Sequence, residues 1–111
     1  MIIDFNKIEE KAIPNFKGGE KEFNAKMNVD ENNKIISGRL QPGASIGLHT
    51  HETNSEIIFF QSGTGKVIYD GKEEKVSAGL CHYCPQGHSH TLINDSDADL
   101  TFCAVIPEHV K

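Results

Sequence analysis

Three histidines and one glutamate between residues 49 and 90 have the spacing of metal ligands. His49 and His51 are two residues apart, so on a β-strand their side chains point to the same face. Glu56 follows a short turn through residues 53–55, and a hairpin of that kind can bring all three side chains together. Two neutral imidazoles and a carboxylate on one face suit a divalent transition metal. His90, at the start of a later predicted strand, could supply a fourth ligand.

Three side chains near His90 in the sequence are candidates for moving a proton. His82 and His88 both lie shortly before His90, and a histidine with a pKa near neutrality can act as a general acid or base. The alternative is that each lies on the surface or at a rim. Tyr83 or Cys84 could line a pocket beside His90. The candidate catalytic residues are therefore His82, Tyr83 and His88.

A substrate pocket beside these ligands needs walls and an anchor. Ile58 and Phe60 share the parity of Glu56 along their predicted strand, so we expect them to form an apolar pocket wall. Arg39 is the only arginine in the chain. If its face of the strand is internal, Arg39 can clamp a substrate carboxylate. If that face is external, Arg39 is an ordinary solvated charge, as most charged side chains are.

Short runs rich in Val, Ile, Phe and Thr, separated by glycines and prolines, must position these side chains. Residues of these types suit β-strands, and many short strands at close spacing predict an all-β sandwich or barrel. Helical periodicity is weak, and its best candidate is residues 6–12, which Pro14 ends. We expect strands near residues 22–29, 34–41, 46–51, 56–62, 66–69, 73–76, 80–84, 91–94 and 100–106.

Length, charge and composition exclude several classes of protein. A chain of 111 residues fits one domain. The net charge of -5, with no stripe of lysines, argues against a nucleic-acid partner. The longest uninterrupted apolar run is Ile57-Ile58-Phe59-Phe60, so we expect no membrane span. Without the features of a signal peptide we expect a cytoplasmic protein, in which the three cysteines are reduced.

Two blocks of the sequence resemble the two motifs of the cupins. The first motif is a glycine, five residues, His-x-His, three or four residues, a glutamate, six residues and a glycine, and it is matched throughout by Gly43, His49, His51, Glu56 and Gly63. The second is a glycine, five residues, Pro-x-Gly, two residues, a histidine, three residues and an asparagine, and it is matched by Gly79, Pro85, Gly87, His90 and Asn94.

This resemblance implies a double-stranded β-helix, the jelly-roll barrel of the cupins. It implies one cupin domain over residues 1–111, with the motifs at 43–63 and 79–94. It also implies one divalent transition metal ion inside the barrel, and the ligand types do not choose between Fe, Mn, Ni, Co, Cu and Zn. The implied metal ligands are His49, His51, Glu56 and His90.

The resemblance gives a scaffold and a metal but no reaction, because cupins include dioxygenases, decarboxylases, isomerases, lyases and binding proteins. We predict first a metal-dependent enzyme acting on a small polar metabolite, an oxygen-bearing acid or a sugar derivative that binds at two open coordination positions. The alternative is a non-catalytic small-ligand-binding or sensor cupin. Because small single-domain cupins are commonly homodimers, we also expect a homodimer, with the predicted apolar face Phe23-Ala25-Met27-Val29 as one possible interface.

Overall fold

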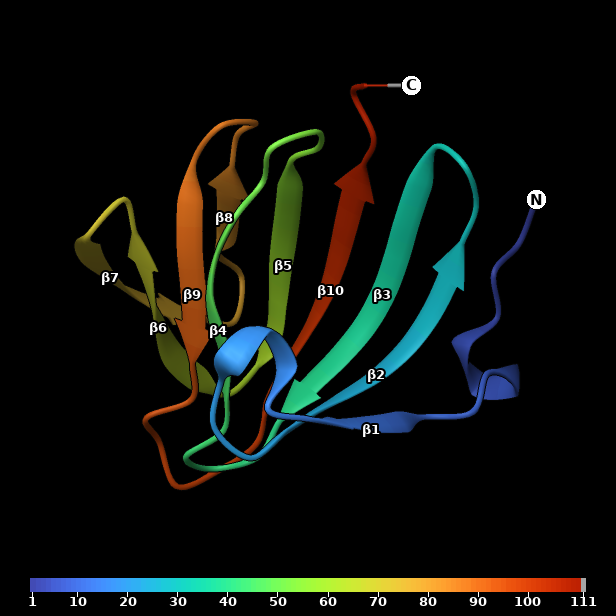
Figure 1. Cartoon of the computed structure of the whole chain (residues 1–111). Helices are drawn as coiled ribbons and strands as arrows, with labels where there is room; N and C mark the ends of the chain where they lie inside the picture. Colours follow the sequence, from blue (N-terminus) through green and yellow to red (C-terminus); the bar gives the residue numbers. More distant parts are fainter. Residues whose placement is uncertain (111) are drawn as a thin grey trace.

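Two antiparallel β-sheets face each other across an apolar interior in the computed structural model, which describes residues 1–110 (Figure 1). Along the chain the elements are η1 (Phe5–Lys7), β1 (Lys11–Pro14), η2 (Phe16–Gly18), β2 (Glu22–Val29), β3 (Asn33–Leu40), β4 (Ser45–Thr50), β5 (Glu56–Ser62), β6 (Thr64–Tyr69), β7 (Lys72–Ser77), β8 (Cys81–Cys84), β9 (Ser89–Ile93) and β10 (Leu100–Pro107). The larger sheet has the order β1-β2-β3-β10-β5-β8, and the smaller one β4-β9-β6-β7. The predicted all-β jelly-roll class is confirmed.

The predicted strands are all present, and the N-terminal segment is the place where the prediction is wrong. Residues 6–12, predicted as a weak helix, contain only the end of the 3₁₀-helix η1 and the start of strand β1. Strand β1 pairs antiparallel with β2, with Lys11 opposite Ala25 and Pro14 opposite Glu22. Backbone pairing at the edge of a sheet has outweighed a marginal local preference, and a proline is tolerated in such an edge strand.

Aromatic side chains pack together in the core between the two sheets. Phe102 of β10 stacks on Phe23 of β2 with ring centroids 5.9 Å apart, and its ring also lies 6.2 Å from that of Phe60. Leu40 and Leu100 pair across β3 and β10 beside them and are fully buried. Each such buried side chain contributes about 1.5–3 kcal/mol to folding.

Gly63 and Asn94, which end the two sequence motifs, contact the backbone of neighbouring segments and do not line the ligand cavity. Gly63 has a φ of +83°, and a Cβ there would lie 2.2 Å from the carbonyl oxygen of Asp99. Asn94 is fully buried, and its Nδ2 donates to the carbonyl oxygens of Leu40 and Ala98, both at 2.8 Å. These positions therefore have structural roles in the turns between strands.

The apolar face of residues 23–29 lies inside the barrel, so it is not available as a dimer interface. Phe23 and Ala25 are each only 2% exposed, and Phe23 packs against Phe16 of η2 at a centroid distance of 5.4 Å. Only Val29, at the end of β2, is well exposed. No helix within residues 1–110 is long and apolar enough to cross a membrane.

Candidate metal centre

A bulge in β4 turns the first two histidines toward the interior. Ile46 pairs with Leu92 of β9, and the register then shifts before His49 pairs with His90. Strict alternation from the buried Ile46 would turn both His49 and His51 outward. The extra residue changes the phase, as β-bulges do, so that Leu48 is exposed and the two histidines face inward.

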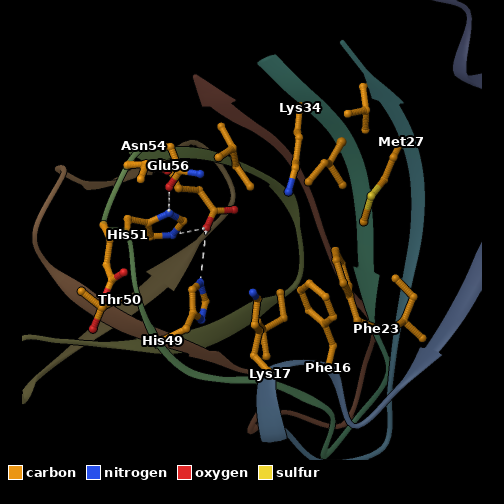
Figure 2. Close-up of a pocket in the computed structure, with 17 residues that line it drawn as sticks. Phe16, Lys17, Phe23, Met27, Lys34, His49, Thr50, His51, Asn54 and Glu56 are labelled. Carbon is orange, nitrogen blue, oxygen red and sulfur yellow. Dashed lines mark hydrogen bonds and ion pairs between the residues drawn. The ribbon is translucent and has the colours of Figure 1, made fainter. Parts of the chain in front are cut away.

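The side chains of His49, His51, Glu56 and His90 converge on one point, and Figure 2 shows the first three. Nε2 of His90 lies 3.0 Å from Nε2 of His51, 3.1 Å from Nε2 of His49 and 3.0 Å from Oε1 of Glu56. The same carboxylate oxygen lies 3.2 Å from Nε2 of His51 and 4.0 Å from Nε2 of His49. All four ligand atoms lie within 4.8 Å of one another, so the cluster could bind one metal ion.

Each imidazole of the cluster is held by its other nitrogen. Nδ1 of His49 donates to the carbonyl oxygen of Gly47 at 2.7 Å, and Nδ1 of His51 donates to Oδ1 of Asn54 at 2.6 Å. Nδ1 of His90 lies 2.9 Å from Nε2 of the buried His82. When Nδ1 donates, Nε2 carries a lone pair, so these contacts fix the ring orientation and tautomer that a metal ligand needs.

The distances between the ligand atoms fit a metal ion. Two lone pairs that face each other at 3.0 Å form no hydrogen bond, whereas a cation between them would satisfy both. An ion about 2.1 Å from each of two nitrogens at a right angle would hold them about 3.0 Å apart, and a tetrahedral angle would hold them about 3.4 Å apart. The contacts of 3.0 to 3.2 Å fall between these two values, so one ion could contact these ligand atoms.

The charges of these groups also suit a cation. Burial raises the pKa of Glu56, but hydrogen bonds with His51 and His90 outweigh it and lower the pKa to about 2. Burial lowers the pKa of His49, and it lowers that of His82 to about 4. At neutral pH the centre therefore presents a carboxylate and a neutral His49, while His82 behind it is also neutral.

His82, predicted as a catalytic residue, lies behind His90. It lies on β8 and is 7% exposed. Its Nε2 is positioned to accept a hydrogen bond from Nδ1 of His90. It does not line the cavity described below. In this position it orients His90 and does not face a bound ligand.

We expect His82→Phe to weaken metal binding by about 10- to 100-fold, the usual effect of losing a group that orients a metal ligand. His82→Gln, which keeps an acceptor oxygen, should recover part of the affinity. Competition with a chromogenic chelator measures both variants. Equal affinity of His82→Phe and the wild type would show that His82 does not orient His90.

A cavity of about 600 Å³ opens beside the cluster (Figure 2). His49, His51 and Glu56 form its polar end. Its other walls are largely apolar and come from β2, β3, β4, β10 and η2. They include Phe16, Phe23, Met27, Ile36, Ile46 and Ile106. This volume lies in the range of about 300–1,000 Å³ that is typical of small-molecule sites.

The structure places the other predicted catalytic residues away from this cavity. Tyr83 is 56% exposed on the outer side of β8. His88 points outward, where its Nδ1 contacts the carboxylate of Asp70 and lies 3.1 Å from the hydroxyl of Tyr69. Within residues 1–110 neither side chain lines the cavity. The chemical role predicted for them has no geometric support.

The predicted pocket residues also take different places. Ile58 and Phe60 face inward as expected, but they are buried in the core and do not line the cavity. Arg39 lies on the outer face, where it pairs with Glu10 at 2.6 Å and with Asp99 at 3.2 Å. Arg39 is therefore not a pocket residue. The alternation of β3 turns Gly38 and Leu40 inward and Arg39 outward.

Sequence reasoning missed two cations and one amide of this site. Lys17 and Lys34 line the cavity, and Asn54 holds His51. Lys34 could have been found, because it shares the parity of the inward Ile36 in the predicted strand. Lys17 and Asn54 lie outside regular strands, so no periodic pattern marks them.

The two-sheet barrel with its His₃Glu cluster defines a cupin with a candidate metal centre. Residues 37–106 match the Cupin domain family, and the chain belongs to it. It is 31% identical over 112 residues to the oxalate-binding protein of Thermotoga maritima, covering 96% of this chain and 93% of that protein. A crystal structure of a predicted oxalate decarboxylase from Thermotoga maritima is similar, with a TM-score of 0.91, 30% identity and coverage of 97% of this chain and 99% of that one.

More distant relatives share only the fold. A sugar phosphate isomerase of the cupin superfamily from Silicibacter pomeroyi has a TM-score of 0.81 at 22% identity. The similarity covers 97% of this chain and 76% of that one. Because function varies widely on one fold, this likeness carries no substrate to the present chain.

Proposed function

We propose that this protein binds one divalent transition metal ion through His49, His51, Glu56 and His90, and that the centre then binds a small carboxylate of the oxalate class. The convergence of three Nε2 atoms and one carboxylate oxygen beside an open cavity carries this proposal. Among the ions that these ligand types suit, Mn, Fe, Co and Ni accept six ligands and would leave positions open for a ligand. Such an ion would supply Lewis acidity and open positions for ligand oxygens. The similarity to an oxalate-binding protein supports the choice of ligand.

The chain's own residues have defined tasks in this proposal. Gly47, Asn54 and His82 hold the three imidazoles in place. The apolar walls exclude water from one side of a bound acid, which strengthens every charge interaction there.

Isothermal titration of the metal-loaded protein with oxalate tests the proposal. We expect one metal ion per chain by elemental analysis, and saturable oxalate binding that disappears when the metal is removed with a chelator. Protein that cannot be loaded with any of the four metals, or oxalate binding that is unchanged in the metal-free protein, would contradict it.

Turnover of the bound acid is a second candidate function, and one observation favours it. Glu52 lies in the cavity wall one residue beyond His51, and a carboxyl group beside a bound acid can move a proton. Hydrogen oxalate would then give formate and carbon dioxide. We expect Glu52→Gln to stop formate release while oxalate binding persists. No formate from the wild type with any of the four metals would leave binding alone as the function.

Metal retention should weaken as the pH falls through neutrality. Burial lowers the pKa of His51, but hydrogen bonds with Glu56 and Asn54 outweigh it, so the pKa lies above the ordinary 6.5. A protonated His51 has no lone pair for the ion, so protons compete with the metal below that raised pKa. Glu56, with a pKa of about 2, stays charged over the same range. Chelator competition between about pH 5 and pH 8 measures this effect, and a constant affinity would contradict it.

We also propose that the protein forms a homodimer, through the outer face of the larger sheet. Phe59 of β5 and Tyr83 of β8 are 51% and 56% exposed, and Ile57 and Val105 lie beside them in the paired strands. A contiguous apolar surface of this kind commonly marks an interface.

Light scattering after size exclusion should give twice the mass of the chain. We expect the double substitution Phe59→Lys with Tyr83→Lys to give a monomer, since it places charges on this face. Leu48→Lys is the matched control, because Leu48 is also an exposed apolar residue, at 67%, but lies on the smaller sheet. A monomeric wild type would contradict the proposal.

A further inference from the structure

The cavity beside the metal centre is large and apolar for a ligand as small as oxalate. Oxalate consists of two carboxylates and has no hydrocarbon to place against a wall. The cavity of about 600 Å³, by contrast, has walls of aromatic and aliphatic side chains opposite the histidines. Among them Phe16 and Met27 are only partly buried by the core, so part of their surface remains for a ligand. Apolar walls of this kind bind hydrocarbon by removing it from water.

Two lysines also face this cavity. Figure 2 shows the side chains of Lys17, from η2, and Lys34, from β3, pointing into it. Lys34 lies near the start of β3, two residues before the inward-facing Ile36, so its side chain is on the same face of the strand. Neither ammonium forms an ion pair with another side chain in the described part of the chain. Cations that line a site without a protein counter-ion are available to an anionic ligand.

The backbone around Lys17 shows that its position is built into the fold. Lys17 has a φ of 56°, in the left-handed region that side chains rarely adopt. Its carbonyl oxygen lies so close to Gly47 of β4 that a Cβ on that glycine would be 2.0 Å away. The close contact of η2 with the bulge in β4 therefore fixes Lys17 beside His49. Strained backbone that is held in this way is common at ligand sites.

The charges in the cavity indicate how many negative charges its ligand carries. Lys17 and Lys34 offset the carboxylates of Glu52 and Glu56, which are the two acidic residues in the cavity wall. The remaining charge is that of a divalent ion at the cluster. A dianion therefore neutralises the site, whereas a monoanion leaves it positive.

We propose that the natural ligand is a dicarboxylate with an apolar substituent, whose charges are shared between the metal centre and Lys17 and Lys34, and whose hydrocarbon packs against Phe16 and Met27. This inference rests on the proposed metal-dependent binding of a carboxylate and names the ligand class for that site. It makes the two lysines and the apolar wall the specificity-determining residues.

Malonate and phenylmalonate form a matched pair of probes, because they differ by one phenyl ring. Titration calorimetry of the full-length protein, loaded with Mn²⁺, measures both. We expect phenylmalonate to bind about tenfold tighter or more, as burial of one aromatic ring would give. Equal affinities, or tighter binding of malonate, would overturn the apolar part of the proposal.

Variants separate the two parts of the site. Lys17→Met and Lys34→Met should each weaken both ligands several-fold and keep the preference for phenylmalonate. Met27→Ala should reduce that preference and leave malonate unchanged. Lys75→Met, on the exposed strand β7, is the control and should change neither affinity. If neither Lys17→Met nor Lys34→Met weakens the binding of either ligand, the lysine part of the proposal is overturned.

Failure of the proposed function itself would look different. In that case the protein either cannot be loaded with a metal, or holds its metal while oxalate, malonate and phenylmalonate all fail to bind. Thermal unfolding of each variant, with and without metal, shows whether a lost affinity reflects a lost fold. A variant that unfolds at the wild-type temperature but binds more weakly supports a direct role for its side chain.

Discussion

His90→Ala should lose its metal. His90 is the ligand closest to all the others, since its Nε2 lies 3.0 to 3.1 Å from His51, His49 and Glu56. Removal of a ligand takes away a donor as well as its orientation, so we expect a loss larger than the 10- to 100-fold that follows from loss of an orienting group such as His82. Elemental analysis after gel filtration, and competition with a chelator, measure the change.

His88→Ala is the matched control for His90→Ala. It removes the same type of side chain two residues away, but the imidazole of His88 points to Asp70 on the outside and lies outside the cluster. We expect its metal content to equal that of the wild type. A His90→Ala protein that retains its metal, or a His88→Ala protein that loses it, would contradict the assignment of ligands.

Part of the ligand cluster could be predicted from local rules, and the rest from the resemblance to the cupin motifs. Alternation along a strand predicted that His49 and His51 share a face, and a short turn predicted that Glu56 lies near them, whereas the place of His90 was implied by the second motif. The bulge in β4 was not visible in the sequence, although it is what turns both histidines inward after Ile46.

The positions of the surrounding residues could not be predicted, because they depend on which strand lies behind which. His82 is near His90 in the sequence and also in space, but it lies on the far side of the ring from the ligand cluster. Sequence distance cannot separate those two arrangements. Lys17 is further from the ligands in the sequence and still lines their cavity, because η2 packs on β4 through close backbone contact at Gly47.

Gly47→Ala is expected to cause the largest loss of stability among the predicted changes. A Cβ at this position would lie 2.0 Å from the carbonyl oxygen of Lys17 and 2.7 Å from the backbone nitrogen of Gly19. Both are backbone atoms, so no side-chain rotation can relieve the overlap. Overpacking costs about 1–3 kcal/mol, and more where the backbone must move. We therefore expect the unfolding temperature to fall by roughly 5 °C or more.

The same substitution should also change the metal centre, which links the stability of the fold to the site. The carbonyl oxygen of Gly47 accepts the hydrogen bond from Nδ1 of His49, so displacement of this segment would release the ring. Metal affinity should fall together with the unfolding temperature of the metal-free protein. Leu48→Ala is the matched control, because that neighbour is 67% exposed and should change both by little. A Gly47→Ala protein as stable as Leu48→Ala would show that η2 does not rest on β4. The position of Lys17 over the cavity would then need another cause.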